Sequence, residues 1–198
     1  MHLLPSLAIC LISIQQAKAL GESLSTTKFD HIYASDLLRA HSTGKAVHER
    51  QPEPIPPFTV SPLLREQHFG AAEGNKWVVE IPPGKTREEC YKEGIYPVLS
   101  GRQAKYEGGE SLDDLAVRAE KALRECVLPH IDSDAHIAIA SHGLCISELM
   151  SELLKLDPKA DRSKSYRGLL NTAWTRVEIE RRVGCMCSGL VQLLTVAD

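Results

Sequence analysis

The stretch Ile137-Ala138-Ile139-Ala140-Ser141-His142-Gly143 is an apolar run that stops abruptly at a Ser-His-Gly turn. Small and β-branched apolar residues in a row are typical of a strand buried on both faces of a parallel sheet. His142 then lies at the carboxyl end of this strand, where open α/β sheets bind ligands, and Gly143 gives a ligand close access to the backbone. The alternative is a histidine that merely caps the strand by bonding a neighbouring carbonyl.

The composition indicates one cytoplasmic domain that acts on a small partner. With 198 residues and 43% hydrophobic residues, the chain is long enough to bury one substantial core. A net charge of −3 and the absence of a long basic run argue against a nucleic acid groove and a polybasic membrane patch. The six cysteines form no repeated Cys-x-x-Cys pairs, which favours reduced thiols over a zinc site.

The amino terminus has two interpretations. Leu3 to Ile14 is mostly apolar and Ala17-Lys18-Ala19 resembles a cleavage site, as in a signal peptide, but no Lys or Arg precedes the run. The run is also short for a membrane span. From Gln15 to Leu24, apolar residues recur at helical spacing, which predicts a helix instead.

A strand and a helix that carries an arginine come next. Phe29 to Ser35 favours extended structure, Ser35-Asp36 can cap a helix, and that helix is expected from Leu37 to about Glu49. Arg39 falls in its first turn, at the carboxyl end of the preceding strand. An arginine there can clamp a phosphate or carboxylate with two hydrogen bonds, although most helix arginines are simply solvated.

Prolines make Gln51 to Pro62 a loop, with a short extended piece around residues 58–60. Glu66 follows, flanked by apolar residues and a glycine. It is either a partly buried carboxyl that exchanges protons near neutral pH or a simple partner of Arg65.

The second half of the chain alternates helices and strands. Asn75 to Gly109 is irregular and is expected to form an insertion over the carboxyl edge of the sheet. Ser111 and Asp114 have the form of a capping box for a long helix that runs to about Pro129. A further helix is expected over 144–156 and late strands over 173–180 and 189–196.

Four motifs in this order resemble those of the histidine phosphatase superfamily, also called phosphoglycerate-mutase-like. They are residues 29–40 followed by Thr43; Leu64-Arg65-Glu66 with Phe69-Gly70 and Glu73-Gly74; Gly109-Glu110-Ser111 with Arg118; and Ala140-Ser141-His142-Gly143. The resemblance extends from Gln15 to about Ile179. Four motifs in register are a specific signal, whereas one alone is weak.

The resemblance implies a three-layer α/β/α fold with a mainly parallel sheet, and phosphoryl transfer through a phosphohistidine. Arg39, His142 and Gly143 correspond to phosphate-binding residues, His142 and Glu66 to catalytic ones, with Glu66 as general acid and base. The implied substrate is a small phosphorylated molecule, and neither a metal nor another cofactor is expected. The chemistry agrees, since a transferring phosphoryl group requires converging cationic donors and one proton donor.

The sequence departs from the family at its nucleophile. The nucleophilic histidine lies in an Arg-His-Gly triplet that ends the first strand, and no such triplet occurs in this chain. Residues 1–14 are therefore expected to be an atypical segment in place of that strand, followed by a histidine-phosphatase-like domain over 15–198. The loss of a central strand predicts unpaired strand edges, which Leu7 to Ile12 partly refill.

Two explanations for the missing triplet remain open: an artefact of the gene start or transcript, and a genuine relative without a nucleophile. The sequence thus predicts either an inactive phosphatase-like chain or a binding module for a phosphorylated ligand or protein. A serine hydrolase is not indicated, because a Gly-x-Ser-x-Gly elbow is absent and Ser141 points away from His142. His130, His136 and His142 recur every six residues, a spacing that suits no single metal centre.

Overall fold

The computed structural model describes residues 5–156, 160, 174–180 and 188–196. The chain forms two compact units, one comprising Met1–Glu66 and Arg118–Asp198 and the other Gln67–Val117. The first unit holds the main sheet and is described first. Cys185 and Cys187 lie outside the described residues, whereas Cys90, Cys126 and Cys145 are buried free thiols, as the sequence predicts.

The first unit contains a five-stranded sheet in the order β2-β1-β5-β7-β6. Neighbouring strands are parallel except for β6 and β7, which confirms the mainly parallel sheet. The apolar run from Ile137 to Ala140 lies in β5, which is buried along nearly its whole length. The strands are β1 His31–Ser35, β2 Phe58–Ser61, β5 His136–His142, β6 Trp174–Glu180 and β7 Ser188–Val196.

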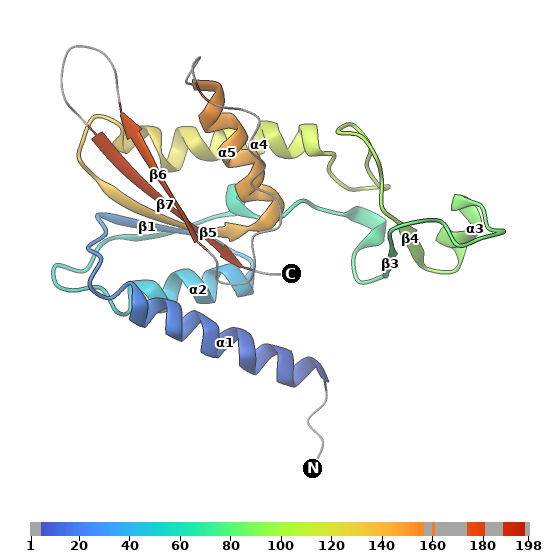
Figure 1. Ribbon diagram of the computed structural model, residues 1–198, viewed down its shortest axis with the longest axis horizontal. Coiled ribbons are helices and arrows are strands. Elements are labelled where there is room, and N and C mark those ends of the chain that lie inside the picture. The colour runs from blue at the N-terminus through green and yellow to red at the C-terminus, as the bar shows by residue number, and fades with distance from the viewer. Residues whose placement is uncertain (1–4, 157–159, 161–173, 181–187, 197–198) are drawn as a thin grey trace. The chain divides into compact units, whose positions relative to one another are not determined.

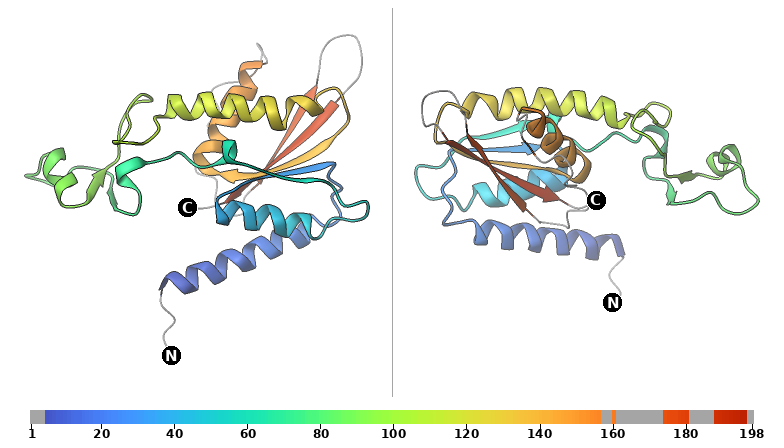
Figure 2. Two further views of the ribbon diagram at one scale, coloured as in Figure 1. Left: turned by 180° about the vertical axis from the view of Figure 1, so that it is seen from behind. Right: turned by 45° about the horizontal axis from the view of Figure 1, so that its top comes forward.

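Helices cover both faces of this sheet, which makes the α/β/α layering visible in Figures 1 and 2. On one face α2 (Leu38–His48) packs on β1 and β5, and α1 (Pro5–Ser23) packs on α2. On the other face lies α5 (Gly143–Leu156), beside the part of α4 (Leu112–Cys126) that follows Val117. The 3-10 helices η1 (Pro62–Leu64) and η3 (Leu128–His130) complete the unit.

Helix α1 confirms the predicted helix from Gln15 onward but begins at Pro5, ten residues earlier. Ala17, Leu20 and Leu24 are buried, and the last two join a core cluster with residues of β1, α2 and β5. A Cβ atom on Gly21 would lie 2.3 Å from the carbonyl oxygen of Ala46, so the glycine permits the close approach of α1 to α2. Because Leu7 to Ile12 are helical, they do not supply a strand to the sheet.

The expectation of unpaired edges around a missing central strand is wrong for β5. This strand pairs with β1 on one side and with β7 on the other, from His136 opposite Leu190 to His142 opposite Val196. Strand β7 comes from the carboxyl end of the chain and in turn pairs with β6. The physical reason is that backbone N–H and C=O groups in a buried sheet require partners, and the chain's own last strand provides them.

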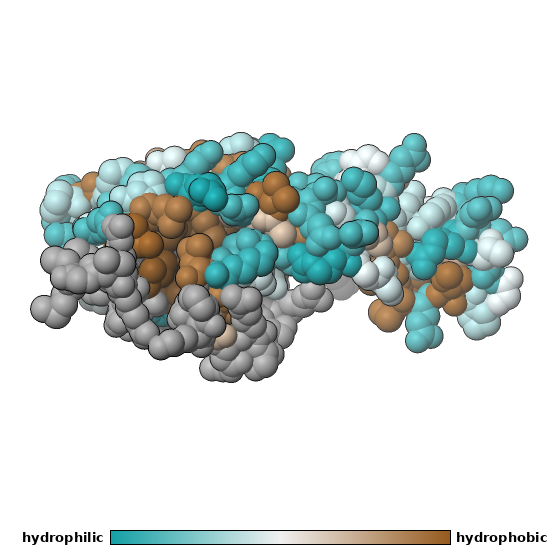
Figure 3. All heavy atoms as spheres, turned by 90° about the horizontal axis from the view of Figure 1, so that it is seen from above, coloured by the Kyte–Doolittle hydropathy of each residue, from teal (hydrophilic) through white to brown (hydrophobic). Residues whose placement is uncertain are grey.

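The second unit contains the irregular segment, and its elements are small. It has the 3-10 helix η2 (Gly70–Ala72), a two-stranded parallel sheet of β3 (Lys76–Val78) and β4 (Ile95–Pro97), and helix α3 (Arg87–Lys92). Its aromatic side chains contact one another, and of these only Tyr106 is buried: Phe69, Trp77, Tyr91, Tyr96 and Tyr106. Large hydrophobic residues such as Val79, 84% exposed, also reach its surface. Figure 3 shows hydrophobic side chains among hydrophilic ones on the face of the molecule that it displays.

Local signals at the helix ends are mostly confirmed. The Ser111–Asp114 capping box forms, because Asp114 N–H donates to Ser111 Oγ and Ser111 N–H donates to Asp114 Oδ2, each over 3.0 Å. Helix α2, by contrast, has Leu37 at its N-cap without a side-chain cap bond, and Ser35 Oγ accepts the N–H of Leu37, which is the N-cap residue itself. The predicted Ser35-Asp36 cap is therefore wrong, because the Ser35 hydroxyl is drawn toward the sheet edge.

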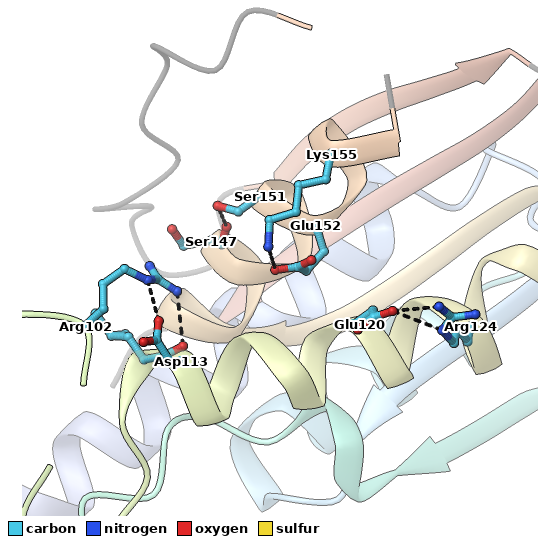
Figure 4. A network of polar contacts seen from close by, with 9 residues as sticks. Arg102, Asp113, Glu120, Arg124, Ser147, Ser151, Glu152 and Lys155 are labelled. Carbon is cyan, nitrogen blue, oxygen red and sulfur yellow. Dashed lines mark hydrogen bonds and ion pairs between the residues drawn. The ribbon is translucent and has the colours of Figure 1, made fainter. Parts of the chain in front are cut away.

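Ion pairs within single elements line the helix surfaces in Figure 4. Arg124 Nη2 lies 2.7 Å from Glu120 Oε1 on α4, and Lys155 Nζ lies 2.5 Å from Glu152 Oε1 on α5. Such pairs contribute little to stability, about 0 to 1 kcal/mol each, so the layers owe their stability mainly to apolar burial. Among the described residues, no helix is both long and apolar enough to cross a bilayer.

Candidate active site

The candidate site lies at the carboxyl edge of the main sheet, where β1 ends at Ser35 and β5 ends at His142. These strands are parallel neighbours, with Ala34 opposite Ala140, so their last residues meet at the same edge. Helix α2 begins just after β1, and α5 begins at Gly143, directly after His142. Two strand ends and two helix amino termini therefore converge, as the Ser-His-Gly turn predicted.

Arg39 and His142 are in direct contact although 103 positions separate them in the sequence. Arg39 Nε donates a hydrogen bond of 3.1 Å to His142 Nδ1. The helix α2 positions Arg39 in its first turn, over the end of β1, as expected. A guanidinium that meets an imidazole at a sheet edge is the arrangement proposed for a phosphate clamp.

His142 is completely buried, and its other ring nitrogen also has a partner. Its Nε2 lies 3.1 Å from Ser35 Oγ. Burial lowers the pKa of His142 from 6.5 to about 3, and the positive charges of Arg39 and Arg118 add to this effect while Asp36 opposes it. The imidazole is therefore neutral at physiological pH in the unliganded chain.

Glu66 is buried and binds the amino terminus of α5. Its carboxylate oxygens accept the backbone N–H groups of Leu144, over 3.2 Å, and Cys145, over 3.1 Å. A carboxylate is favoured there because the helix terminus carries partial positive charge and unpaired N–H groups. Glu66 thus lies beside Gly143, where an added Cβ atom would come within 3.9 Å of Glu66 Oε2.

Arg118, from α4, fixes the backbone that carries Glu66. Its Nη1 donates to the carbonyl oxygens of Leu63, over 3.0 Å, and Arg65, over 2.7 Å, and its Nη2 donates to that of Glu66, over 2.9 Å. Three carbonyls held by one guanidinium define the path of the segment after η1. Ser141 Oγ adds a bond of 2.7 Å to the carbonyl of Leu64, so the hydroxyl is directed away from the edge that His142 faces.

The alternative role of Glu66 as a simple partner of Arg65 is wrong. Arg65 forms a two-bond ion pair with Asp36, with distances of 2.7 Å from Nε to Oδ1 and 2.6 Å from Nη2 to Oδ2. The hydrogen bond from Arg65 holds the pKa of the Asp36 carboxyl below its ordinary value. This pair ties the loop after β1 to the segment that bears Glu66.

The sequence found the outline of this site and missed its inner contacts. Arg39, Glu66, His142 and Gly143 all lie at one edge, as predicted. Their catalytic and phosphate-binding roles stay predictions, and so does proton exchange at Glu66. Sequence reasoning treated Ser35 only as a helix cap and gave Arg118 no role; the signal for Ser35 was a hydroxyl residue as the last residue of a strand. Within the described residues, no group of three His, Cys, Asp or Glu side chains is arranged to hold a metal ion.

Comparison with known proteins establishes the class to which this fold and site belong. Residues 12–186 match the family model of the histidine phosphatase superfamily, branch 1, and the chain therefore belongs to that superfamily. Its members transfer or hydrolyse phosphoryl groups. Strand β7, which pairs with β5, begins at Ser188 and so lies just beyond the matched residues.

Particular relatives include mutases and phosphatases. The chain is 26% identical over 144 residues to a 2,3-bisphosphoglycerate-dependent phosphoglycerate mutase of Gloeobacter violaceus, covering 73% of this chain and 63% of the relative's length. A mycobacterial glucosyl-3-phosphoglycerate phosphatase solved with inorganic phosphate is 25% identical with a TM-score of 0.51, covering 73% of this chain and 68% of the other. A phosphoglycerate mutase structure from Bacillus anthracis, 19% identical, with a TM-score of 0.51 and coverage of 77% and 71%, shares the fold.

Proposed function

We propose that the carboxyl edge of the main sheet binds the phosphoryl group of small phosphomonoesters, and that the chain with the printed sequence does not turn them over. The observation that carries the proposal is the contact between Arg39 and His142, which places a guanidinium and an imidazole within 3.1 Å at the end of two parallel strands. The mycobacterial relative solved with inorganic phosphate supports the choice of ligand.

Catalysis in this family's manner requires a nucleophile that the sequence does not contain. A phosphohistidine mechanism forms a bond from an imidazole nitrogen to phosphorus while the ester oxygen leaves with a proton. Water then gives up a proton to a base and attacks phosphorus, the bond from nitrogen to phosphorus breaks, and phosphate leaves. Arg39 supplies donors for the phosphoryl oxygens, His142 lies beside it, and Glu66 supplies a carboxyl group. His142 cannot also be the nucleophile in this arrangement, because both of its ring nitrogens are engaged by Arg39 and Ser35.

A second candidate function is a non-catalytic module that recognises a phosphorylated small molecule or protein. The imidazole of His142 is neutral and hydrogen-bonded at both ring nitrogens. This arrangement favours the alternative, because neither nitrogen is available to attack phosphorus. Turnover separates the two functions, and ligand binding is common to both. Since two relatives carry phosphoglycerate in their names, phosphoglycerates are the first ligands to test.

The proposal is tested by binding and turnover measured on the same preparation. Inorganic phosphate is titrated into the purified chain by calorimetry, and an activated phosphomonoester is used to detect hydrolysis. We expect weak phosphate binding that Arg39→Ala abolishes, and turnover lower than that of an active relative by several orders of magnitude. The matched control is Arg50→Ala, because Arg50 also lies in the first unit but pairs with Glu22 over 3.0 Å.

A result that contradicts the site is tight phosphate binding that does not respond to Arg39→Ala. A result that contradicts the absence of catalysis is turnover that survives metal chelation and is abolished by His142→Ala. In that case another group has taken the place of the nucleophile.

Reconstruction provides the positive test of the catalytic interpretation. Residues 1–14 are replaced by a family-like strand that ends in Arg-His-Gly, with a loop leading to Gln15. Because β7 already pairs with β5, the rebuilt chain is made both with and without residues 188–198. We expect labelled substrate to leave an acid-labile, alkali-stable label that disappears when the new histidine becomes alanine, and Glu66→Gln to slow poor leaving groups most. A folded, phosphate-binding reconstruction that never labels supports the binding module.

A further inference from the structure

His142 is held by a hydrogen bond at each of its ring nitrogens, and the donor at Nδ1 is Arg39. Arg39 Nε carries a hydrogen that it donates to His142 Nδ1 over 3.1 Å. A guanidinium in a protein stays protonated and cannot accept a hydrogen bond. His142 Nδ1 must therefore present its lone pair, and a neutral ring then carries its only proton on Nε2.

Ser35, at the end of β1, accepts the hydrogen bond that this Nε2–H donates. Its Oγ lies 3.1 Å from His142 Nε2, and it also accepts the N–H of Leu37 over 3.2 Å. Ser35 and His142 are both completely buried, so no water competes at this contact. Arg39 and Ser35 thus fix both the tautomer and the orientation of the ring, and Ser35 acts as a positioning residue.

The charges around the ring explain why it stays neutral and what can change this. Arg39 on α2 and Arg118 on α4 face His142 with positive charge, in addition to the cost of burial. The opposing carboxylate of Asp36 is already paired with Arg65. Glu66, the other carboxylate at this edge, is held by the N–H groups at the start of α5. An additional negative charge at Arg39 is the change that favours a protonated ring.

We propose that Arg39 and Ser35 hold His142 as a neutral Nε2–H imidazole in the unliganded chain, and that an oxyanion bound to Arg39 releases Nδ1 to take up a proton from solvent. The ligand class is a tetrahedral oxyanion, such as inorganic phosphate, sulfate or a phosphomonoester. This inference rests on the proposed function, because it needs an anion at Arg39. Its consequence is that anion affinity rises as pH falls, with proton uptake at one named atom.

The first test examines the unliganded chain. Long-range proton–nitrogen NMR of the His142 ring distinguishes a protonated Nε2 from a protonated Nδ1. We expect the Nε2–H form in the wild type and in Ser35→Thr, which retains the hydroxyl. Ser35→Ala should shift the Nε2 resonance because its acceptor is gone. A ring protonated at Nδ1, or at both nitrogens near neutral pH, overturns the proposal.

The second test uses sulfate, whose charge does not change over the range in which histidine titrates. Calorimetry in two buffers of different ionisation enthalpy, at about pH 5 and about pH 7.5, gives the number of protons bound per sulfate. We expect tighter binding and uptake of up to one proton at the lower pH, both lost in His142→Asn. The matched control is His130→Asn, because His130 also has a lowered pKa but bonds Tyr33 OH elsewhere on β1.

The outcomes distinguish this inference from the proposed function. Sulfate binding that is lost in Arg39→Met but involves no proton uptake at either pH overturns the inference and leaves the anion site in place. Equal uptake in wild type and His142→Asn also overturns it, because the proton then goes elsewhere. A chain that is folded by NMR and binds no sulfate overturns both.

Discussion

Histidines lie at both edges of the sheet formed by β1 and β5, and the surroundings of these histidines differ. At the carboxyl edge, His142 is completely buried and faces two guanidinium groups, those of Arg39 and Arg118. At the amino edge, His31 stacks on Tyr33 with ring centroids 4.1 Å apart and bonds Thr59 Oγ1 over 2.8 Å. Burial is the largest cause that lowers the pKa of His31, as it is for His142.

The difference shows that a histidine at a strand end does not by itself make an anion site. His130 at the amino edge bonds Tyr33 OH over 2.8 Å, and the charge that acts on it is the carboxylate of Asp30. Aromatic rings, hydroxyls and a carboxylate provide these histidines with ring contacts, hydrogen bonds and a nearby negative charge, but they do not attract an anion. The carboxyl edge adds converging cations and helix amino termini, the groups on which the proposed anion site rests. The predictions below test this contrast.

The largest effect is expected from removing β7, because this strand pairs with β5 from the amino edge of the sheet to the carboxyl edge. Deletion of residues 188–198 leaves β5 without its partner from His136 to His142. Unpaired backbone groups and uncovered apolar surface should then remove cooperative folding, a loss on the order of the whole 5 to 15 kcal/mol of a domain's stability. Chemical denaturation followed by near-ultraviolet circular dichroism measures this. Deletion of only Ala197 and Asp198, beyond β7, is the control.

A truncated chain that unfolds as sharply as the full one would show that β7 is dispensable. The full chain itself is now expected to unfold cooperatively. The unpaired strand edges that the sequence predicted would make the chain poorly soluble or partly molten, and the pairing of β7 with β5 removes that reason for β5.

The next largest effect is expected in acid, where the two edges should differ in degree. The pKa of His142 is about 3 in the folded chain, against an ordinary histidine value of 6.5. The contribution of His142 to the free energy of unfolding is therefore fully present above pH 6.5. It is lost as pH falls toward 3, because the unfolded chain binds the proton at a higher pH than the folded chain. The slope is up to about 1.4 kcal/mol per pH unit, or roughly 3 kcal/mol by about pH 4.

Urea denaturation between about pH 7 and about pH 4 measures this dependence. In His142→Asn the corresponding slope should disappear. In the double variant His31→Asn, His130→Asn the slope should also decrease, because the pKa values of these two histidines are lowered as well. The decrease should be slight, because both rings are partly exposed. A slope that follows the amino-edge histidines instead would reverse the contrast.

A smaller effect is expected from Arg118→Lys. A lysine cannot reach the three carbonyls of Leu63, Arg65 and Glu66 at once, so the loss should be about 2 kcal/mol. Thermal unfolding gives the stability change, and phosphate titration shows whether the site is displaced as well. Arg124→Lys on the same helix, where Arg124 pairs only with Glu120, is the control and should change stability by a few tenths of a kcal/mol.

The smallest effect is expected at the amino edge from Tyr33→Phe. This change removes the hydrogen bond of 2.8 Å to His130 and keeps the ring that stacks on His31, so stability should fall by about 1 kcal/mol. Phosphate affinity should stay unchanged. If phosphate binding weakens as much as in Arg39→Ala, the two edges are coupled and cannot be treated as separate.

The sequence alone predicted most elements of the main sheet unit and the sheet edge at which the candidate site lies. The apolar run of β5 and the helical spacing after Gln15 were readable because periodicity and side-chain shape act locally. The positions of Arg39 and His142 followed as well, since the carboxyl ends of parallel strands share one edge. The class of protein followed from four motifs, each a short local pattern.

Only the tertiary structure decided which groups meet. The contact of Arg39 with His142 joins residues 103 positions apart, and the three bonds from Arg118 join α4 to the segment of Glu66. Likewise, β7 takes its place beside β5 from the far end of the chain, where the local pattern predicted a strand without a partner. The physical reason is that pairing of backbone groups and burial of charge are satisfied by whichever partners the fold brings together, and those partners are set by the whole chain.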